Sequence, residues 1–402
     1  MTLWVDVGDL LSYGGAFQRP SGVQRVVFEL CRALAEGDAG LGGTGFVHHG
    51  RRGFERVEWR AINGAFARLN EDPPAPGSAW LLQMRALFAL LAIPASLLPT
   101  RGQAEGSVMR RGDVLLVAGA GWSDPDHVAQ VTKARARDGV TVALLVYDII
   151  PVLRPEWFDR AQSARFRRWL DGMLAVSDRL LAISEATSRD VVAYCADSGW
   201  PERRVPVVRL GDGFAGGPGV SSIGRPYVLF VSTMEIRKNH ALLVDVWRRL
   251  LAELGPDAVP VLVFAGRRGG LTGDLMREVQ ASDVLGGHVL LRPDADDREM
   301  AGLYRGCLFT VFASLYEGWG LPVAESLAFG RPCLASSASS VPEVGGDLVR
   351  YFDPLDPDDC AGLVKSLLRD GAGLAAWAAQ IAAEYRPSPW SVTACGVHDG
   401  VA

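Results

Sequence analysis

The sequence predicts an α/β protein of two doubly wound domains, each with a parallel sheet between layers of helices. Three observations lead to this prediction. The 402 residues are enough for two or three domains. Short apolar runs of strand length alternate with glycine-containing loops and amphipathic helical segments. A glycine-rich stretch, residues 211–219, interrupts this alternation, which restarts at residue 227 and therefore predicts two units joined by a linker.

The first domain is predicted to span residues 1–212. Residues 3–7 form its expected first strand, and a glycine-containing loop leads from this strand to a helix over residues 23–36. In that helix valine and leucine recur at three- and four-residue spacing, which is typical of an amphipathic helix. Further strands are expected at residues 113–118, 140–146, 179–183 and 205–210, and a basic amphipathic helix at residues 158–176.

An apolar segment, residues 80–99, lies within an insertion of residues 80–111. Its length of about 20 residues is close to that of a membrane span, but Gln83 and Arg85 lie inside it and Pro94 would break a helix. Two interpretations stay open. One is a long helix that packs on the first domain, and the other is an interfacial helix that docks on a membrane carrying a lipid-linked acceptor. A true span is the least favoured.

The second domain is predicted to span residues 225–385 and to repeat the alternation of strands and helices. Strands are expected at residues 227–231, 259–266 and 289–292, and helices at residues 240–254, 299–305, 353–369 and 377–385. The final segment, residues 386–402, is short and helix-poor by composition. It is therefore set apart from the second domain.

Residues 308–335 predict a strand, a loop with two glycines, a very short helix and another strand. Residues 308–313 are apolar, β-branched and aromatic, as in a buried parallel strand. Pro322 fits the first position of a helix, where its missing N–H group costs nothing. Gly330 suits the left-handed residue that ends a helix. Cys333 then begins the next strand.

This strand–loop–helix unit has the chemistry of a nucleotide-sugar site. Glu317 lies outside the carboxyl end of a strand, where open α/β sheets bind ligands. Gly318 and Gly320 allow close approach of the backbone to a ligand, and the N–H groups of the helix's first turn suit a phosphate. Glu317 and Glu325 flank this anion site and are suited to accept hydrogen bonds from hydroxyls. A pyrophosphate with hydroxyls on both sides is a nucleotide sugar.

Two adjacent cations, Arg237 and Lys238, follow the strand at residues 227–231. Cations are disfavoured at the start of a helix unless an anion is present, because the helix dipole is positive there. The pair therefore fits a phosphate site.

The stretch Glu317 to Pro332, EGWGLPVAESLAFGRP, resembles the paired-glutamate signature of family 4 of the retaining glycosyltransferases, which have the GT-B fold. The resemblance implies two Rossmann-like domains that face a central cleft, with the acceptor bound by the first and the donor by the second. It also implies glycosyl transfer with retention and without a metal. In the GT-B fold the C-terminal segment crosses back to the first domain. Residues 386–402 could do the same, and the short, helix-poor tail after Trp390 leaves a truncated crossing open.

Two stretches of the first domain resemble the same family. SGVQRVVFEL is similar to the family's TGIQRV stretch, which implies that Gly22 lies near the donor phosphates, with Arg25 beside it. The sequence YDIIP is similar to HDLIP, so Tyr147 stands where many members have a histidine. By this resemblance Asp148 is a catalytic candidate. Tyr147 and Trp122, each in a loop after a strand, are predicted to contact the acceptor.

The resemblance also assigns roles in the second domain. Lys238 and Arg237, with the amides of residues 318–321, would stabilise the departing phosphate. Glu317 would hold hydroxyls of the sugar and Glu325 those of the ribose. The predicted donor-binding residues are Gly22, Glu325, Gly318, Trp319, Gly320, Leu321, Arg292, which would lie near the base, and Thr233, which stands where a more widespread variant has arginine.

The overall charge and composition argue against some other classes of protein. A net charge of −5 and a pI near 5.8 argue against a nucleic-acid binder that relies on phosphate neutralisation. The six cysteines form no C-x-x-C pair, so buried reduced thiols are expected and no metal site is predicted. The N-terminus lacks the basic region of a secretory signal, and the predicted location is the cytoplasm. Contact with the inner face of the plasma membrane is left open.

The sequence therefore predicts a hexosyltransferase that needs no cofactor. The RKN form of the cation loop resembles bacterial mannosyl- and rhamnosyltransferases of surface polysaccharide synthesis, which favours GDP-mannose as the donor. The expected acceptor is a hydroxyl of a growing, lipid-linked bacterial glycan. Two alternatives stay open: a non-catalytic partner that binds nucleotide sugars, and a GT-B epimerase that acts on them.

Overall fold

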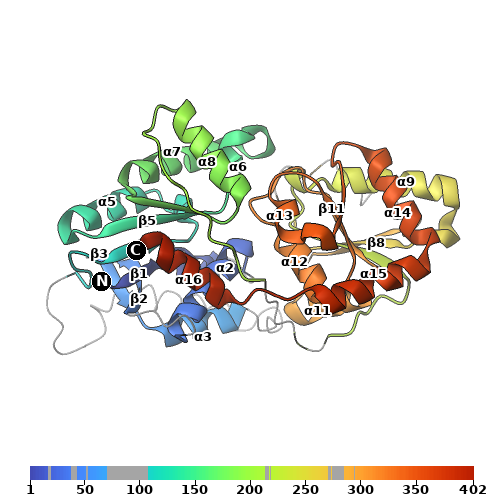
Figure 1. Ribbon diagram of the computed structural model, residues 1–402, viewed down its shortest axis with the longest axis horizontal. Coiled ribbons are helices and arrows are strands. Elements are labelled where there is room, and N and C mark those ends of the chain that lie inside the picture. The colour runs from blue at the N-terminus through green and yellow to red at the C-terminus, as the bar shows by residue number, and fades with distance from the viewer. Residues whose placement is uncertain are drawn as a thin grey trace.

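A computed structural model of the protein shows two α/β domains side by side (Figure 1). The structure describes residues 1–16, 20–37, 43–50, 53–69, 107–212, 217, 219–269, 273, 285–293 and 295–402. Each domain contains one six-stranded sheet. The prediction of two Rossmann-like domains is confirmed.

The first sheet has the strand order β3-β2-β1-β4-β5-β6, and all neighbours are parallel except β2 and β3. Its strands are β1 (Leu3–Asp6), β2 (Thr44–Gly50), β3 (Gly53–Val57), β4 (Val114–Val117), β5 (Thr141–Val146) and β6 (Arg179–Ala182). Its helices are α1 (Gly8–Ala16), α2 (Gly22–Ala35), α3 (Trp59–Leu69), α5 (His127–Asp138), α6 (Ile150–Leu153), α7 (Arg160–Val176) and α8 (Glu185–Asp197).

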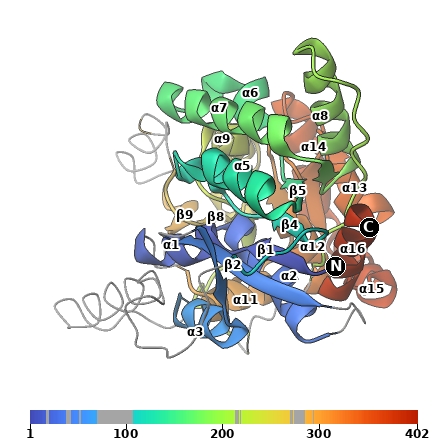
Figure 2. The same ribbon diagram turned by 90° about the vertical axis from the view of Figure 1, so that its left-hand side faces the viewer.

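Helices cover both faces of the first sheet, because successive side chains of a strand point to opposite faces. Val5 of β1 packs in a core with residues of α1, α2 and α3, whereas Trp4 packs on the other face with residues of α5 and α7. Figure 2 shows this arrangement from the side of the first domain. Strands buried on both faces are near-continuous apolar runs, which is why they could be recognised in the sequence.

The second sheet has the strand order β12-β11-β10-β7-β8-β9, and all of its neighbours are parallel. Its strands are β7 (Tyr227–Val231), β8 (Val261–Ala265), β9 (Val289–Arg292), β10 (Thr310–Phe312), β11 (Cys333–Ser336) and β12 (Arg350–Phe352). Its helices are α9 (His240–Leu254), α11 (Asp297–Gly306), α12 (Leu321–Ala328), α13 (Val341–Gly345), α14 (Pro357–Arg369) and α15 (Gly371–Glu384).

The C-terminal segment differs from the helix-poor tail that its composition suggested. Trp390–Val401 form a helix, α16. Trp390, Ala394, Val397 and Val401 are buried at helical spacing and pack in the core of the first domain. Tertiary packing of this apolar face outweighs the weak helix propensity of the segment. The chain therefore crosses back from the second domain to the first (Figure 1).

Two other elements of the first domain differ from expectation. Residues 8–16, expected in a loop, form the helix α1, whose Leu10 and Leu11 are buried in the core. Residues 205–210, expected as a strand, make only an isolated bridge between Val207 and Ala182. In both places the local sequence pattern does not distinguish a helix or a strand from a loop. Packing on the sheet determines the secondary structure that forms.

The apolar stretch at residues 80–99 lies outside the described residues, so neither interpretation of it is tested. Within the ranges that the structure describes, no helix is long and apolar enough to span a bilayer. The six cysteines are free, and all except the half-buried Cys395 are buried, as expected.

Candidate active site

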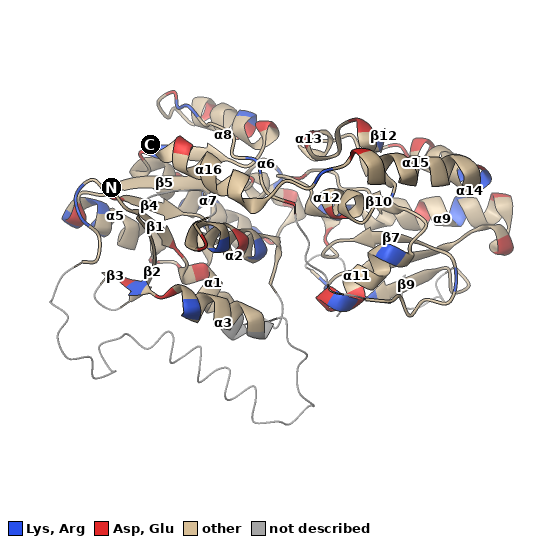
Figure 3. Cartoon of the chain, turned by 60° about the horizontal axis from the view of Figure 1, so that its bottom comes forward, with Lys and Arg blue, Asp and Glu red and all other residues tan. Residues whose placement is uncertain are grey.

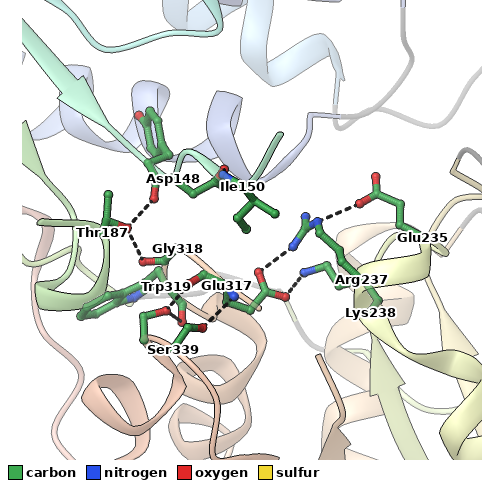
Figure 4. A network of polar contacts seen from close by, with 12 residues as sticks. Asp148, Ile150, Thr187, Glu235, Arg237, Lys238, Glu317, Gly318, Trp319 and Ser339 are labelled. Carbon is green, nitrogen blue, oxygen red and sulfur yellow. Dashed lines mark hydrogen bonds and ion pairs between the residues drawn. The ribbon is translucent and has the colours of Figure 1, made fainter. Parts of the chain in front are cut away.

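Three loops that follow the carboxyl ends of parallel strands meet between the two domains (Figure 4). The loop after β10 carries Glu317, the loop after β7 carries Arg237 and Lys238, and the loop after β5 carries Asp148. Because this edge of an open α/β sheet is where ligands bind, the meeting point is the candidate active site.

A buried ion cluster forms the centre of the site. Arg237 Nη1 lies 2.9 Å from Glu317 Oε2, and Lys238 Nζ donates to Glu317 Oε1. Arg237 Nε also lies 3.1 Å from Glu235 Oε2. Lys238 and Glu317 are only 8% and 7% exposed. Two cations therefore converge on one carboxylate in a place with little water.

The charges of the cluster shift one another's pKa values. Burial alone would raise the pKa of Glu317, but Lys238 and Arg237 outweigh it and lower that pKa to about 2. Burial lowers the pKa of Lys238, and repulsion from Arg237 acts in the same direction, while Glu317 opposes both. Burial would also lower the pKa of Arg237, but attraction to Glu317, Glu235 and Asp148 raises it. Glu317 and Arg237 are therefore held in their charged forms.

The backbone explains why the two cations point at Glu317. Ile236–Lys238 form a single 3₁₀ turn, and Asn239 follows in the left-handed region with φ 60°. Asparagine tolerates this conformation better than most residues. The Asn239 side-chain nitrogen donates to the Pro354 carbonyl at 2.8 Å, and the Leu315 N–H donates to the Arg237 carbonyl at 2.7 Å. The asparagine of the RKN sequence thus sets the turn that aims the cations.

The loop after β10 requires its glycines for two different reasons. Gly320 has φ 129°, a region that favours glycine. A Cβ atom on Gly318 would lie 2.0 Å from the Tyr147 carbonyl oxygen. The backbone of the first domain therefore requires a glycine here, and the predicted approach of Gly318 to a ligand stays a prediction. Helix α12 then begins at Leu321 with Pro322 in its first turn, and Gly330 has φ 66°, as predicted.

Glu325, the second glutamate of the pair, is bonded at both oxygens. Arg25 Nη1 of the first domain lies 2.7 Å from Glu325 Oε1, and the buried Tyr304 hydroxyl donates to Oε2 at 2.7 Å. Arg25 Nη2 also lies 3.5 Å from Asp297 Oδ1. The family resemblance implies that Arg25 lies near the donor phosphates, and the structure shows a direct contact with Glu325. Nothing in the local pattern around Tyr304 or Asp297 indicated their part in this contact.

Gly22 lies at the start of α2, opposite α12. A Cβ atom on Gly22 would be 3.9 Å from Leu321 Cδ1. Leu321 and Trp319 pack against the core of the first domain. The indole N–H of Trp319 is buried and has no hydrogen-bond partner among the described residues. The first turns of α2 and α12 are thus brought together across the interface. The donor-binding roles of Gly22, Trp319 and Leu321 stay predictions.

The first-domain residues occupy different environments. Asp148 faces Gly318, and its Oδ1 accepts from the Ile150 N–H at 3.0 Å. Burial raises the pKa of Asp148, and the positive charge of Arg237 offsets part of this rise. The Tyr147 hydroxyl, expected to face the acceptor, is instead buried and donates to the Ala118 carbonyl at 2.7 Å. The β5 strand directs this side chain into the apolar core, so the phenol does not replace the family's histidine in this conformation.

The remaining candidates lie at the edge of the cluster. Trp122 is half-buried and packs edge-on against Phe166 and Trp169, with 5.2 Å between ring centroids in both pairs. Arg292 ends β9, and its Nε lies 3.6 Å from Glu299 Oε1. Thr233 is half-buried in the loop after β7. Their predicted roles toward acceptor and donor stay predictions. Within the described residues, no group of histidine, cysteine and acidic side chains is arranged to hold a metal ion.

Comparisons with known proteins find glycosyltransferases. Residues 220–383 match the family described as glycosyl transferases group 1. The chain is 28% identical over 261 residues to the serotype-specific mannosyltransferase WbdA of Escherichia coli, covering 61% of this chain and 32% of that protein. It is 31% identical over 144 residues to the O-antigen chain mannosyltransferase B of Escherichia coli, covering 36% of this chain and 37% of that protein. The chain thus spans about a third of the length of these curated relatives.

Solved structures share the whole fold. Anabaena Alr3699/HepE, crystallised with UDP and glucose, aligns with a TM-score of 0.62 over 99% of this chain and 98% of that chain, at 14% sequence identity. At this identity the likeness shows the fold alone. Because the alignment covers both domains, the arrangement of two Rossmann-like domains is that of a GT-B protein.

Proposed function

We propose that this chain, whose residues 220–383 are a glycosyl transferases group 1 domain, is a retaining hexosyltransferase that uses a nucleotide sugar. The donor favoured is GDP-mannose, because two of the relatives are mannosyltransferases. The acceptor is a hydroxyl of a bacterial surface glycan, lipid-linked during its growth. The chemistry takes place in the cytoplasm, with peripheral contact to the membrane that carries the acceptor.

One observation carries the proposal: two cations converge on Glu317 at the carboxyl edge of the second sheet. Lys238 and Arg237 are well placed to neutralise a pyrophosphate that approaches the first turn of α12. A phosphate would then compete with Glu317 for these cations. Once released, the carboxylate accepts hydrogen bonds from hydroxyls of the transferred sugar.

The nucleoside half of the donor lies on the other side of the pyrophosphate. Glu325 holds the ribose there, and its charge is balanced by Arg25 from the first domain. The base lies beside β9, near Arg292. Asp148, on the first-domain side of Glu317, orients the acceptor hydroxyl.

The reaction breaks the bond between the sugar's anomeric carbon and the phosphate oxygen. The acceptor oxygen bonds to the same face of that carbon, and the acceptor's proton passes to the departing phosphate. No metal or cofactor takes part in this scheme. Stabilising the negative charge on the leaving phosphate is the protein's main task, and Lys238 and Arg237 carry it out.

The described contacts give less support to the two alternative functions. A non-catalytic partner that binds nucleotide sugars would need Arg237 and Lys238 for the pyrophosphate, but it would have no need for the buried Glu317, which competes with the phosphate for both cations. An epimerase would need no acceptor, yet Asp148 of the first domain lies directly against the Gly318 loop.

Thermal unfolding with a panel of nucleoside diphosphates and nucleotide sugars tests the donor class. Ligand that binds only the native state raises the unfolding midpoint by mass action. We expect guanosine nucleotides to give the largest shift, and Glu325→Ala to reduce it because the ribose loses an acceptor. If no nucleotide shifts the midpoint of the wild-type protein, the proposed function is wrong.

A further inference from the structure

A carboxylate of the second domain caps a helix of the first. Glu343 Oε2 accepts from the Glu185 N–H at 2.7 Å, and Glu343 Oε1 accepts from the Ala186 N–H at 2.8 Å. Both amides belong to the first turn of α8, a helix of 13 residues. Glu343 belongs to α13, which lies at the edge of the second domain that faces the first (Figures 1 and 3).

The two hydrogen bonds between Glu343 and the start of α8 are strong for an interdomain contact. The first N–H groups of a helix have no partner within the helix, and the helix dipole makes them partly positive. Ser184 Oγ accepts from the Thr187 N–H at 3.0 Å, so the helix's own cap satisfies one of these groups. Glu343 satisfies two more, with charge-assisted hydrogen bonds. When the domains separate, these amides and the carboxylate must all be solvated again.

The first two turns of α8 hold both reacting loops. The Thr187 hydroxyl donates to the Tyr147 carbonyl at 3.0 Å, next to Asp148. The Tyr316 hydroxyl lies 2.8 and 2.9 Å from the two carboxylate oxygens of Asp190. On the side of the second domain, the Ser340 hydroxyl lies 2.9 Å from the carbonyl oxygens of Glu317 and of Trp319.

These contacts form a continuous connection. Residue 340 at the start of α13 fixes the backbone of the Glu317 loop, and Glu343, one turn later, fixes α13 to α8. Helix α8 in turn fixes the Asp148 loop through Thr187. Together with the Tyr316–Asp190 contact, Glu343 therefore helps to set the distance between Glu317 and Asp148.

We propose that Glu343 is a positioning residue for glycosyl transfer, which holds the donor side and the acceptor side of the site in register. This inference rests on the proposed function. Reactions of bound partners depend steeply on orientation, and a misplacement of about 1 Å can lower the rate on the order of 100-fold. The nucleotide itself contacts mainly the second domain, so its binding depends much less on Glu343.

Glu343→Ala and Glu343→Gln test the proposal, with Asp347→Ala as the matched control. Asp347 is an exposed carboxylate in the 3₁₀ turn that follows α13, four positions further along the chain. We expect Glu343→Ala to lower kcat about 10- to 100-fold and to change the nucleoside diphosphate Kd by less than about threefold. Glu343→Gln keeps one acceptor oxygen and should restore part of kcat.

Small-angle X-ray scattering supplies a readout that needs no activity. Glu343→Ala should enlarge the radius of gyration as the domains separate, whereas Asp347→Ala should match the wild-type protein. Equal kcat and equal radius of gyration in Glu343→Ala and Asp347→Ala would overturn the inference. A parallel loss of kcat and of thermal midpoint, without domain separation, would assign Glu343 to folding and would also overturn it. A wild-type protein that transfers no sugar would instead contradict the proposed function, while scattering would still test the contact.

Discussion

Replacing Lys238 by alanine is expected to lower turnover of the nucleotide sugar at least ~100-fold, the scale for removing one group that stabilises developing charge in a transition state. Lys238 is 8% exposed, and its ammonium group shares the Glu317 carboxylate with Arg237. In a site that excludes water, its charge on a leaving phosphate is poorly replaced by solvent. Steady-state kinetics with a saturating donor measure the effect.

Lys365→Ala is the matched control for Lys238→Ala. Lys365 lies on α14 and forms a surface ion pair with Glu253, with 2.9 Å between Nζ and Oε1. Surface pairs of this kind contribute about 0–1 kcal/mol to stability, so removing one should leave turnover unchanged. Near-normal turnover in Lys238→Ala would contradict the role given to the cation loop.

Glu317→Gln is expected to separate binding from catalysis. Turnover should fall at least ~100-fold because the hydroxyls of the sugar lose a charged acceptor. Affinity for the nucleoside diphosphate should rise about ten-fold, the scale of one charge-assisted hydrogen bond, because Lys238 and Arg237 lose the anion that competes with phosphate. Calorimetric titration and kinetics measure the two effects independently.

Glu253→Gln provides a charge-matched control, since Glu253 is an exposed carboxylate that pairs with Lys365. It should change neither turnover nor nucleotide affinity. Weaker nucleotide binding in Glu317→Gln would show that the carboxylate supports the cations more than it competes for them, contrary to the account.

The effect of Glu317→Gln on the free energy of unfolding is expected to depend on pH. The folded-state pKa of Glu317, about 2, lies below its ordinary value of 4.5. A lowered folded pKa means that the carboxylate contributes stability fully above pH 4.5, and that this contribution is lost as pH falls toward 2. The difference in unfolding free energy between wild type and Glu317→Gln should therefore shrink over this range. Urea unfolding at several pH values measures it.

The local structure of the second domain could be predicted well because its signals are local. Pro322 and Gly330 mark the two ends of α12, and Gly330 has the left-handed φ of 66° that a glycine there permits. The cations of the RKN sequence could be recognised because the positive end of a helix dipole disfavours a cation unless an anion is present. The turn before Asn239 directs both cations toward Glu317, and their role toward a phosphate stays a prediction.

Contacts between distant parts of the chain could not be predicted in the same way. Arg25 and Glu325 are 300 positions apart, and Glu343 and Glu185 are 158 apart. No periodicity or spacing in the sequence connects such pairs. The helix α16 was missed for a related reason, because its stability comes from packing on the first domain and not from its own residues.

The most direct test of the central claim is the stereochemistry of slow donor hydrolysis in the absence of an acceptor, followed by proton NMR. The donor is the α-linked nucleotide sugar whose base gives the largest thermal shift, with GDP-mannose first. Retention predicts that the α-anomer of the free sugar appears first, before mutarotation, and we expect Lys238→Ala to abolish its release. Initial release of the β-anomer, or no release of sugar from any nucleotide sugar that binds, would contradict a retaining transferase.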